Sequence, residues 1–137
     1  MIEAGQLSEG VKVLEALLKA EPHDLDALYT LGDAYFELGR AVDACEAYEA
    51  ILQVAPDEID ALISLGLVHY HNDRLDDAEK CYRQALTQQP DSVFALNSLG
   101  DLCFARDRTG EAKECFVKAS EIDPEDPQGY FNLAEFY

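Results

Sequence analysis

A 34-residue interval dominates this sequence. The string LYTLGDAYFELGR begins at Leu28, LISLGLVHYHNDR at Leu62 and LNSLGDLCFARDR at Leu96. The same interval separates four prolines, Pro22, Pro56, Pro90 and Pro124. Between these fixed columns the residues vary freely, as expected where only the contacts between neighbouring units are constrained. A period of this length predicts an array of stacked supersecondary units rather than a single irregular core.

Each unit contains two apolar patterns with helical spacing. In the first, Leu28, Leu31 and Tyr35 follow the i, i+3, i+7 spacing of one helix face. The second pattern covers residues 42–54, and the proline after it cannot donate the next helical hydrogen bond, so the helix is expected to end there. Soon after each proline an aspartate can cap the next helix, at Asp24, Asp57, Asp91 and Asp126.

Small residues recur where the two helices of a unit are expected to cross. One column contains Gly32, Gly66 and Gly100, and a second contains Gly10, Ala44, Ala78 and Ala112. Glycine inside a helix costs about 1 kcal/mol relative to alanine, so its recurrence indicates a close packing contact that outweighs this loss. The expected contact partners are the large side chains of a further column, Leu14, Tyr48, Tyr82 and Phe116.

These columns resemble the tetratricopeptide repeat, a helix–turn–helix unit of 34 residues. The resemblance covers essentially the whole chain, and the central unit carries the family's columns as Leu62, Leu65, Gly66, His69, Ala78, Tyr82, Ala85 and Pro90. It implies an all-α fold, a right-handed α-solenoid of stacked helix pairs. Complete repeats are expected at 25–58, 59–92 and 93–126. We expect only a second helix in residues 1–24, and only a first helix, acting as an end cap, in residues 127–137.

The charge balance restricts the possible partners. Asp and Glu number 28 and Lys and Arg number 10, which gives a formal net charge of −18. Such a surface repels phosphate, so we expect no nucleic-acid binding and no attraction to anionic membranes. No apolar run is long enough to cross a bilayer, and MIEAGQLSEG lacks the features of a secretory signal. A basic partner fits this charge, although acidity also maintains solubility or suits a high-salt habitat.

The resemblance implies that the first helices line the concave side of the array. No Lys or Arg falls on a first helix before its last turn. Carboxylates among large apolar side chains suit a peptide that carries Lys or Arg beside apolar anchors, whereas the alternative is that some rings pack between helices. The expected groove residues are Asp26, Tyr29, Thr30, Asp33, Phe36, Ile63, Ser64, Leu67, Tyr70, Phe94, Asn97, Ser98, Asp101, Phe104, Phe131 and Asn132.

Two finer interpretations concern this groove. One subset of the family binds the carboxylate tail of heat-shock chaperones through Lys, Arg and Asn on the first helices. The corresponding positions here hold no cation, so we set that specificity aside: they are Tyr29, Asp33, Ser64, Phe94 and Ser98. A column of short polar residues either hydrogen-bonds the backbone of an extended peptide or simply faces solvent, and it consists of Thr30, Ser64, Ser98 and Asn132.

No pattern in the chain indicates catalysis. The cysteines form no C-x-x-C pair, the acidic stretches lack the order of a calcium loop, and there is no glycine-rich phosphate loop. We therefore expect no enzyme activity, no cofactor and no metal, and the four cysteines favour a reducing cytoplasm. The predicted function is a protein–protein interaction scaffold that binds a peptide segment. The alternatives are a regulatory array within a larger enzyme, such as a transferase, and a homo-oligomer that assembles end to end.

Overall fold

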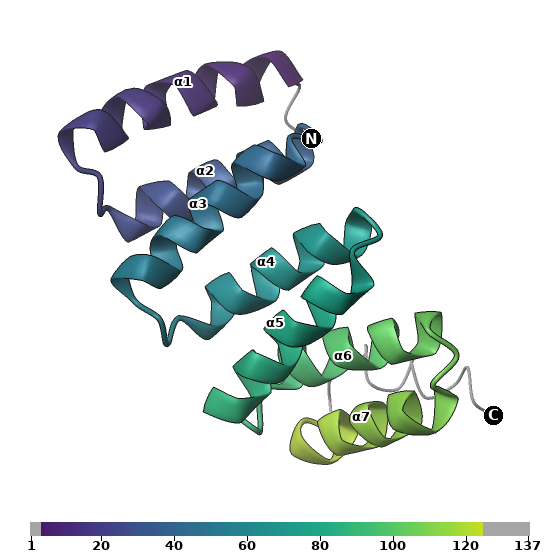
Figure 1. Ribbon diagram of the computed structural model, residues 1–137. Coiled ribbons are helices and arrows are strands. Elements are labelled where there is room, and N and C mark those ends of the chain that lie inside the picture. Colours follow the sequence, from purple (N-terminus) through teal and green to yellow (C-terminus); the bar gives the residue numbers. More distant parts are fainter. Residues whose placement is uncertain (1–3, 125–137) are drawn as a thin grey trace. The chain divides into compact units, whose positions relative to one another are not determined.

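The computed structural model describes residues 4–124, and this part of the chain contains seven α-helices and no strand (Figure 1). The helices are α1 (Ala4–Ala20), α2 (Leu25–Glu37), α3 (Ala41–Val54), α4 (Ile59–His71), α5 (Leu75–Gln88), α6 (Val93–Ala105) and α7 (Thr109–Ile122). The chain divides into two compact units, of which the first ends at Val68 and the second begins at His69. Helix α4 spans this division.

In the first unit, α2 packs against both α1 and α3. The large side chains Tyr48 and Ile51 of α3 are buried, with exposed fractions of 2% and 0%. A Cβ atom added to Gly32 of α2 would lie 2.7 Å from the ring of Tyr48, well inside van der Waals contact. This geometry confirms the predicted close crossing, because any side chain at position 32 would displace the ring.

The second unit repeats this arrangement with α6 packed against α5 and α7. Its core contains Tyr82 and Phe116, both almost fully buried, together with Leu102. Gly100 of α6 faces the ring of Phe116 so closely that an added Cβ atom would overlap it. The glycine column is therefore a packing feature of this unit as well.

Gly10 does not behave as the other members of its column do. Ala44, Ala78 and Ala112 are completely buried, whereas Gly10 is exposed and a Cβ atom there would meet nothing within 4 Å. Among the described helices α1 packs against α2, and Gly10 lies on a side of α1 that this contact leaves open. Gly10 therefore shares the sequence column of these alanines but not their buried packing.

The three turns inside the repeats share one backbone geometry. Gly39, Asp73 and Asp107 have φ angles of 76°, 62° and 60°, in the left-handed region. The amide of the following arginine then donates back to the carbonyl oxygen of the preceding helix, as in Arg40 N to Tyr35 O at 2.8 Å and Arg108 N to Cys103 O at 2.8 Å. This bond is typical of a helix terminated by a left-handed residue.

Caps at the helix N-termini agree with the prediction in one case and differ in another. The carboxylate of Asp24 accepts a hydrogen bond from the amide of Ala27 at 3.2 Å, as expected for α2. At α6 the cap is Ser92, whose hydroxyl accepts from the amide of Ala95 at 3.2 Å. Asp91 lies one residue too early to reach this position, so its predicted capping role is wrong. Asp126 and the end cap expected in residues 127–137 lie outside the described residues.

Candidate functional site

The outer side of α2 carries most of the residues predicted for the first repeat. Asp26, Thr30 and Asp33 are exposed, and Phe36 has an exposed fraction of 36%. Tyr29 is half-buried. We call these five residues the α2 face. Because they recur at helical spacing on one helix, carboxylates and aromatic rings alternate along this face.

Two carboxylates of the first unit are hydrogen-bonded to its own tyrosines. The hydroxyl of Tyr48 donates to Asp33, and the hydroxyl of Tyr29 donates to Glu58 at 3.0 Å. Burial raises the pKa of Tyr48, and the bond to Asp33 raises it further; burial and the Glu58 carboxylate act on the pKa of Tyr29 in the same way. These tyrosines therefore remain protonated donors, and Asp33 is held in place by the core.

The predicted column of short polar residues has other partners within the first unit. The hydroxyl of Thr30 donates to the carbonyl oxygen of Asp26 in its own helix at 2.8 Å. Ser64 is a further hydrogen-bond partner of Tyr48, and this bond offsets part of the rise in the pKa of that tyrosine. In the second unit Ser98 is buried, with an exposed fraction of 7%. The contacts of Thr30 and Ser64 and the burial of Ser98 favour a local role for these side chains over a ladder for a peptide backbone.

Helix α4 contributes less surface than predicted. Ile63 has an exposed fraction of only 2%, so it is a core residue and not an exposed anchor; Ser64 and Leu67 are half-buried. The buried positions of α4 are not confined to one stripe, since Ala61, Leu62 and Ile63 are consecutive. Helical spacing alone assumes one buried face, and that assumption fails where a helix is covered over a wider arc.

In the second unit, the outer side of α6 carries the largest exposed rings. Phe94 and Phe104 have exposed fractions of 56% and 45%, and Asp101 is exposed between them. Asn97 and Ser98, predicted for the same surface, are instead buried because α6 buries six consecutive residues from Ala95 to Gly100. We call Phe94, Asp101 and Phe104 the α6 face.

Tyr70, at the end of α4, belongs to the second unit and is half-buried. Burial raises the pKa of Tyr70, and the negative charge of Asp101 raises it further. The ring of Tyr70 also meets the ring of His71 edge to face, with centroids 5.6 Å apart. The remaining predicted residues, Phe131 and Asn132, lie outside the described residues.

The distribution of cations matches the prediction. All ten Lys and Arg residues fall within residues 4–124, and none lies in α2, α4 or α6. The same three helices carry exposed carboxylates at Asp26, Asp33, Asp60 and Asp101. Their outer faces therefore present negative charge with no cation on the same helix to neutralise it.

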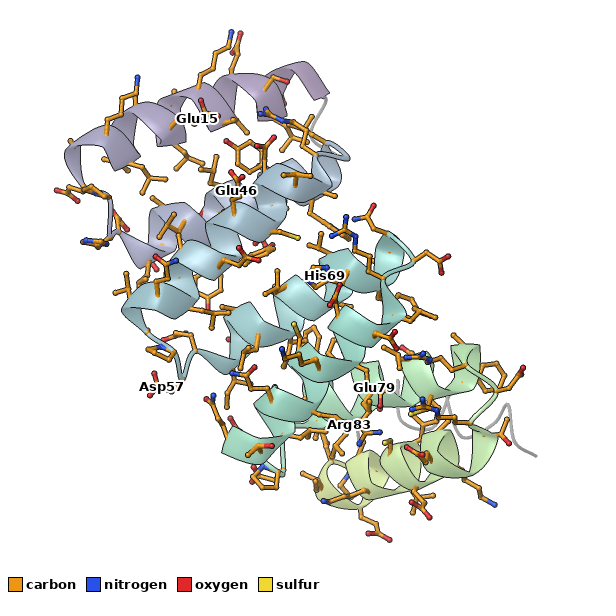
Figure 2. The ribbon with its side chains drawn as sticks, in the orientation of Figure 1. Glu15, Glu46, Asp57, His69, Glu79 and Arg83 are labelled. Carbon is orange, nitrogen blue, oxygen red and sulfur yellow. The ribbon has the colours of Figure 1, made fainter. Side chains whose placement is uncertain are left out.

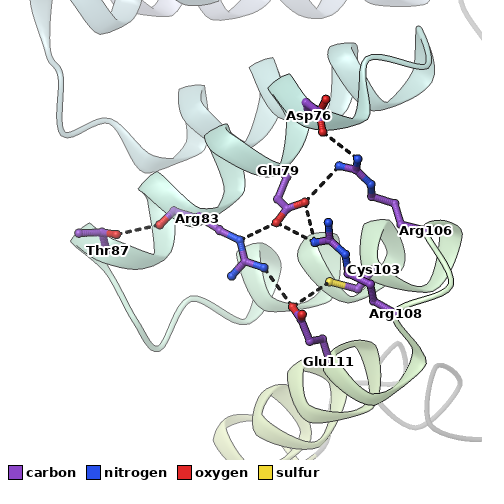
Figure 3. Close-up of polar contacts among 8 residues, drawn as sticks. All are labelled: Asp76, Glu79, Arg83, Thr87, Cys103, Arg106, Arg108 and Glu111. Carbon is purple, nitrogen blue, oxygen red and sulfur yellow. Dashed lines mark hydrogen bonds and ion pairs between the residues drawn. The ribbon is translucent and has the colours of Figure 1, made fainter.

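A polar network that the sequence reasoning missed lies in the second unit, where three arginines converge on Glu79 of α5. Figure 2 locates Glu79 and Arg83 on this helix, and Figure 3 shows the network. Glu79 accepts from Arg83 at 2.8 Å, from Arg108 at 3.0 Å and from Arg106 at 3.2 Å. Burial acts to raise the pKa of Glu79, but the hydrogen bonds from Arg83 and Arg108 outweigh it, so the pKa lies below its ordinary value.

Two further carboxylates complete this network. Arg106 contacts Asp76 at 2.7 Å, and Arg83 contacts Glu111 at 3.0 Å. The thiol of Cys103 lies 3.8 Å from Glu111. Each of the three arginines is thus paired with a carboxylate of its own unit, and the network links α5 to α7 and to the turn before α7. The recurrence of arginine at the end of each quoted string was the signal that could have pointed to it.

The described residues show no other chemical centre. Within residues 4–124, no three His, Cys, Asp or Glu side chains are grouped as metal ligands require. Cys103 is fully buried, and Cys45, Cys81 and Cys115 are half-buried; none of these four cysteines is in a disulfide bond within the described residues. Among the helices described here, none combines the length and the apolar character that crossing a membrane demands.

Paired helices at a 34-residue interval, crossing at glycine and alanine columns, define an all-α solenoid of helical repeats. Family models described as tetratricopeptide repeat match residues 2–59 and residues 57–125. The chain belongs to the tetratricopeptide repeat family, which confirms the predicted family and fold class. No curated protein is significantly similar to it.

Solved structures show the same fold at low sequence identity. A crystal structure of MamA has a TM-score of 0.84 at 22% identity, covering 97% of this chain and 78% of that chain. MamA from Desulfovibrio magneticus RS-1 has a TM-score of 0.79 at 24% identity, covering 90% and 70%. The first repeat domain of Spaghetti (RPAP3), bound to the HSP90 peptide SRMEEVD, has a TM-score of 0.75 at 19% identity, covering 81% and 88%.

Proposed function

We propose that this chain is a protein-interaction module that binds a peptide segment in which Lys or Arg side chains stand beside apolar ones. The single observation that carries the proposal is the α6 face, where Phe94 and Phe104 are 56% and 45% exposed on either side of Asp101. Large exposed rings on a soluble helical repeat are typical of a binding surface. The α2 face repeats the combination with Asp26, Asp33 and Phe36.

Electrostatics supports a basic partner over an acidic one. Helices α2, α4 and α6 carry no Lys or Arg, and the chain as a whole has a net charge of −18. The RPAP3 domain shows that this fold can hold a peptide, but SRMEEVD contains three carboxylate side chains and one arginine. An acidic peptide of this kind would meet like charges on the present faces. We extend the proposal to a reducing compartment such as the cytoplasm, because none of the four described cysteines is in a disulfide bond.

A selection from a displayed library of random twelve-residue peptides tests the proposal. We expect enrichment of peptides that combine Lys or Arg with aromatic or aliphatic residues, and we expect their affinity to fall as salt is raised. Peptide SRMEEVD serves as a directed probe, and we expect it to remain unbound at about 1 mM. Enrichment of Asp- and Glu-rich peptides, or no enrichment at all, would overturn the proposal.

Self-association is the second candidate function. It is favoured by α1, where Val13 and Leu17 are exposed by 69% and 41% and stand one helical turn apart. Apolar side chains arranged in this way can pack against another copy of the chain. Sedimentation equilibrium over a wide concentration range decides the point, since a constant monomer mass excludes this candidate. Val13→Asp with Leu17→Asp should abolish any association that is seen.

A further inference from the structure

Helix α1 follows the second-helix pattern, and one of its sides packs against the first helix of the next repeat. In the complete repeats a second helix also packs against the first helix of its own repeat, as α3 does with α2 and α7 with α6. The side of α1 that faces α2 carries Val11, which is 2% exposed, and Glu15. The carboxylate of Glu15, labelled in Figure 2, accepts a hydrogen bond from the hydroxyl of Tyr35 of α2. These contacts fix the orientation of α1 about its axis.

The adjoining side of α1 is exposed at positions that are buried in the other second helices. Val13 and Leu17 have exposed fractions of 69% and 41%, and Gly10 is exposed as well. The residues that stand in place of Leu17 in α3, α5 and α7 are completely buried: Ile51, Ala85 and Ala119. We call Gly10, Val13 and Leu17 the α1 face. By its positions in the repeat, it corresponds to the surface with which a second helix contacts the first helix of its own repeat.

The repeat itself defines what fits the α1 face. Where α2 meets α3, Gly32 lies against the ring of Tyr48, and where α6 meets α7, Gly100 lies against the ring of Phe116. The matching occupant is therefore a helix that carries the first-helix columns, with a small residue at the point of closest approach.

One first-helix pattern, in residues 127–137, has no second-helix pattern paired with it among the 137 residues. The segment lies outside the described residues, and its sequence alone carries the pattern. Its residues at i, i+3, i+4 and i+7 continue the columns of the earlier repeats: Tyr130, Leu133, Ala134 and Tyr137. The same columns in the third complete repeat hold Leu96, Leu99, Gly100 and Cys103. Helix α1 and this segment thus carry the two complementary halves of one repeat.

The two halves also match in size at the point of closest approach. In the first complete repeat, a Cβ atom at Gly32 would lie 2.7 Å from the ring of Tyr48, so an alanine there would overlap the ring. In the segment the glycine column holds Ala134, and in α1 the column of Tyr48 holds Leu14, which is half-buried. The methyl group of the alanine would meet a side chain smaller than an aromatic ring, so the combined volume is nearly conserved.

We propose that the α1 face binds residues 127–137 of a second copy of this chain, and that the two segments form a complete repeat between the copies. This inference rests on the self-association proposed above as the second candidate function and deepens it, because it names the segment that covers α1. The contact joins two different surfaces, so it is heterologous, and further copies add head to tail unless the assembly closes into a ring. Each copy has a net charge of −18, so added salt should strengthen the association by screening the repulsion.

Sedimentation velocity of the full chain tests the association. One helix pair is smaller than a standard protein interface, so the protein is measured up to about 1 mM, at low and at high salt. We expect the mean mass to rise with concentration, and to rise further when salt is added. A constant monomer mass under all these conditions would overturn the inference.

Two blocked variants test which surfaces are joined. Val13→Asp with Leu17→Asp disables the α1 face, and Leu133→Asp disables the segment that docks on it. We expect each variant alone to be monomeric. Their equimolar mixture should form a 1:1 dimer and no larger species, because each variant keeps one intact surface. In a symmetric dimer that joins α1 to α1, Leu133→Asp alone would still dimerise.

Val42→Asp is the matched control for the α1 face. Val42 of α3 is 69% exposed, as Val13 is, and it lies outside the face. This variant should associate as the wild type does, and its failure to associate would show that any added charge prevents the contact. Circular dichroism melts establish that every variant is folded.

A pair of substitutions tests the match in size. Leu14→Phe should weaken the association about fivefold or more, because the ring would overlap the methyl group of Ala134. Ala134→Gly added to Leu14→Phe restores the pairing of a glycine with a ring and should recover most of the affinity. If Ala134→Gly fails to rescue, the two side chains are not in contact and the shared repeat is wrong.

The outcomes separate this inference from the functions proposed above. If the chain associates but Leu133→Asp still forms the same species, or the mixture of blocked variants stays monomeric, self-association stands and the shared repeat is wrong. If the wild type stays monomeric, self-association fails as well, and peptide binding is judged independently by the library selection. A 1:1 dimer from the mixture, together with rescue by Ala134→Gly, supports both self-association and the shared repeat.

Discussion

Tyr48 of α3 donates its hydroxyl hydrogen to the carboxylate of Asp33 on α2, so a side chain of the candidate surface is held by a buried residue of the core. The same ring fills the space beside Gly32. One aromatic residue therefore sets both the distance between the two helices and the position of an exposed carboxylate. Substitution of Asp33 by lysine would disturb the fold as well as the surface charge, so it is a poor test of binding.

Tyr48→Phe is expected to lower the free energy of unfolding by about 1 kcal/mol, because it removes this hydrogen bond and keeps the ring. Urea denaturation followed by circular dichroism measures the change. Asp33→Asn is the companion variant, since its amide oxygen can still accept from Tyr48 and the loss should be smaller. Unchanged stability in Tyr48→Phe would show that the bond contributes nothing.

Gly32→Ala is expected to destabilise the chain by about 1–3 kcal/mol, because the new methyl group would lie 2.7 Å from the ring of Tyr48. Gly10→Ala provides the matched control. Nothing lies within 4 Å of a Cβ atom at position 10, and alanine favours a helix interior over glycine by about 0.5–1 kcal/mol. The two variants should therefore change the unfolding midpoint in opposite directions. A stable Gly32→Ala protein would contradict the close crossing.

Acid should weaken the second unit through Glu79. The pKa of Glu79 is lowered in the folded state, so its contribution to stability is present above the ordinary glutamate pKa of about 4.3 and is lost as the pH falls through the folded value. Glu79→Gln should lower the free energy of unfolding at pH 7 by about 1–2 kcal/mol. The difference between wild type and variant should shrink as the pH approaches 3, as measured by urea denaturation at each pH.

Glu114→Gln removes an exposed carboxylate of α7 in the same unit and serves as the control for this titration. It should leave the dependence on pH close to that of the wild type. A constant difference between wild type and Glu79→Gln from pH 7 to pH 3 would contradict the assigned role of Glu79.

Cys103 should be the least reactive of the cysteines. Its side chain is fully buried, and burial raises the pKa of the thiol to about 11, with the charges of Cys115 and Glu111 adding to the shift. Since the thiolate is the nucleophile, labelling with an aromatic disulfide reagent at pH 8 should be at least about tenfold slower at Cys103 than at half-buried Cys45. Peptide mapping after partial labelling identifies the sites. Equal rates at all four thiols would contradict this burial.

Much of the fold could be predicted from the sequence, because the residues that form the helix contacts recur at equivalent positions in each repeat. The glycines that meet Tyr48 and Phe116, the buried Ala44 and the buried Cys103 are all visible as members of such columns. Three repeats carry similar residues at each of these positions, so the agreement between them is improbable by chance.

The candidate site was less predictable, since exposure depends on how many neighbours surround a helix. Ile63 and Asn97 occupy the helical position of half-buried Tyr29 of α2, and Ser98 occupies that of exposed Thr30, yet all three are buried. Apolar spacing gives the direction of the core but not the width of the buried arc. The Glu79 network was not predicted from the sequence for a different reason. Its partners Arg106 and Arg108 are 27 and 29 residues away in the chain, in a turn whose backbone places them beside α5.

The three turns with a left-handed residue at Gly39, Asp73 or Asp107 have one geometry but different sequences, ELGR, HNDR and ARDR. The hydrogen bond from the arginine amide back to the preceding helix depends on the backbone conformation of the turn and not on the side chains before the arginine. A tetrapeptide from one repeat should thus be graftable into another. For protein engineers, the tips at Gly39 and Asp73 are the better positions for tags or foreign loops, because the tip at Asp107 stands between Arg106 and Arg108, which bind Glu79.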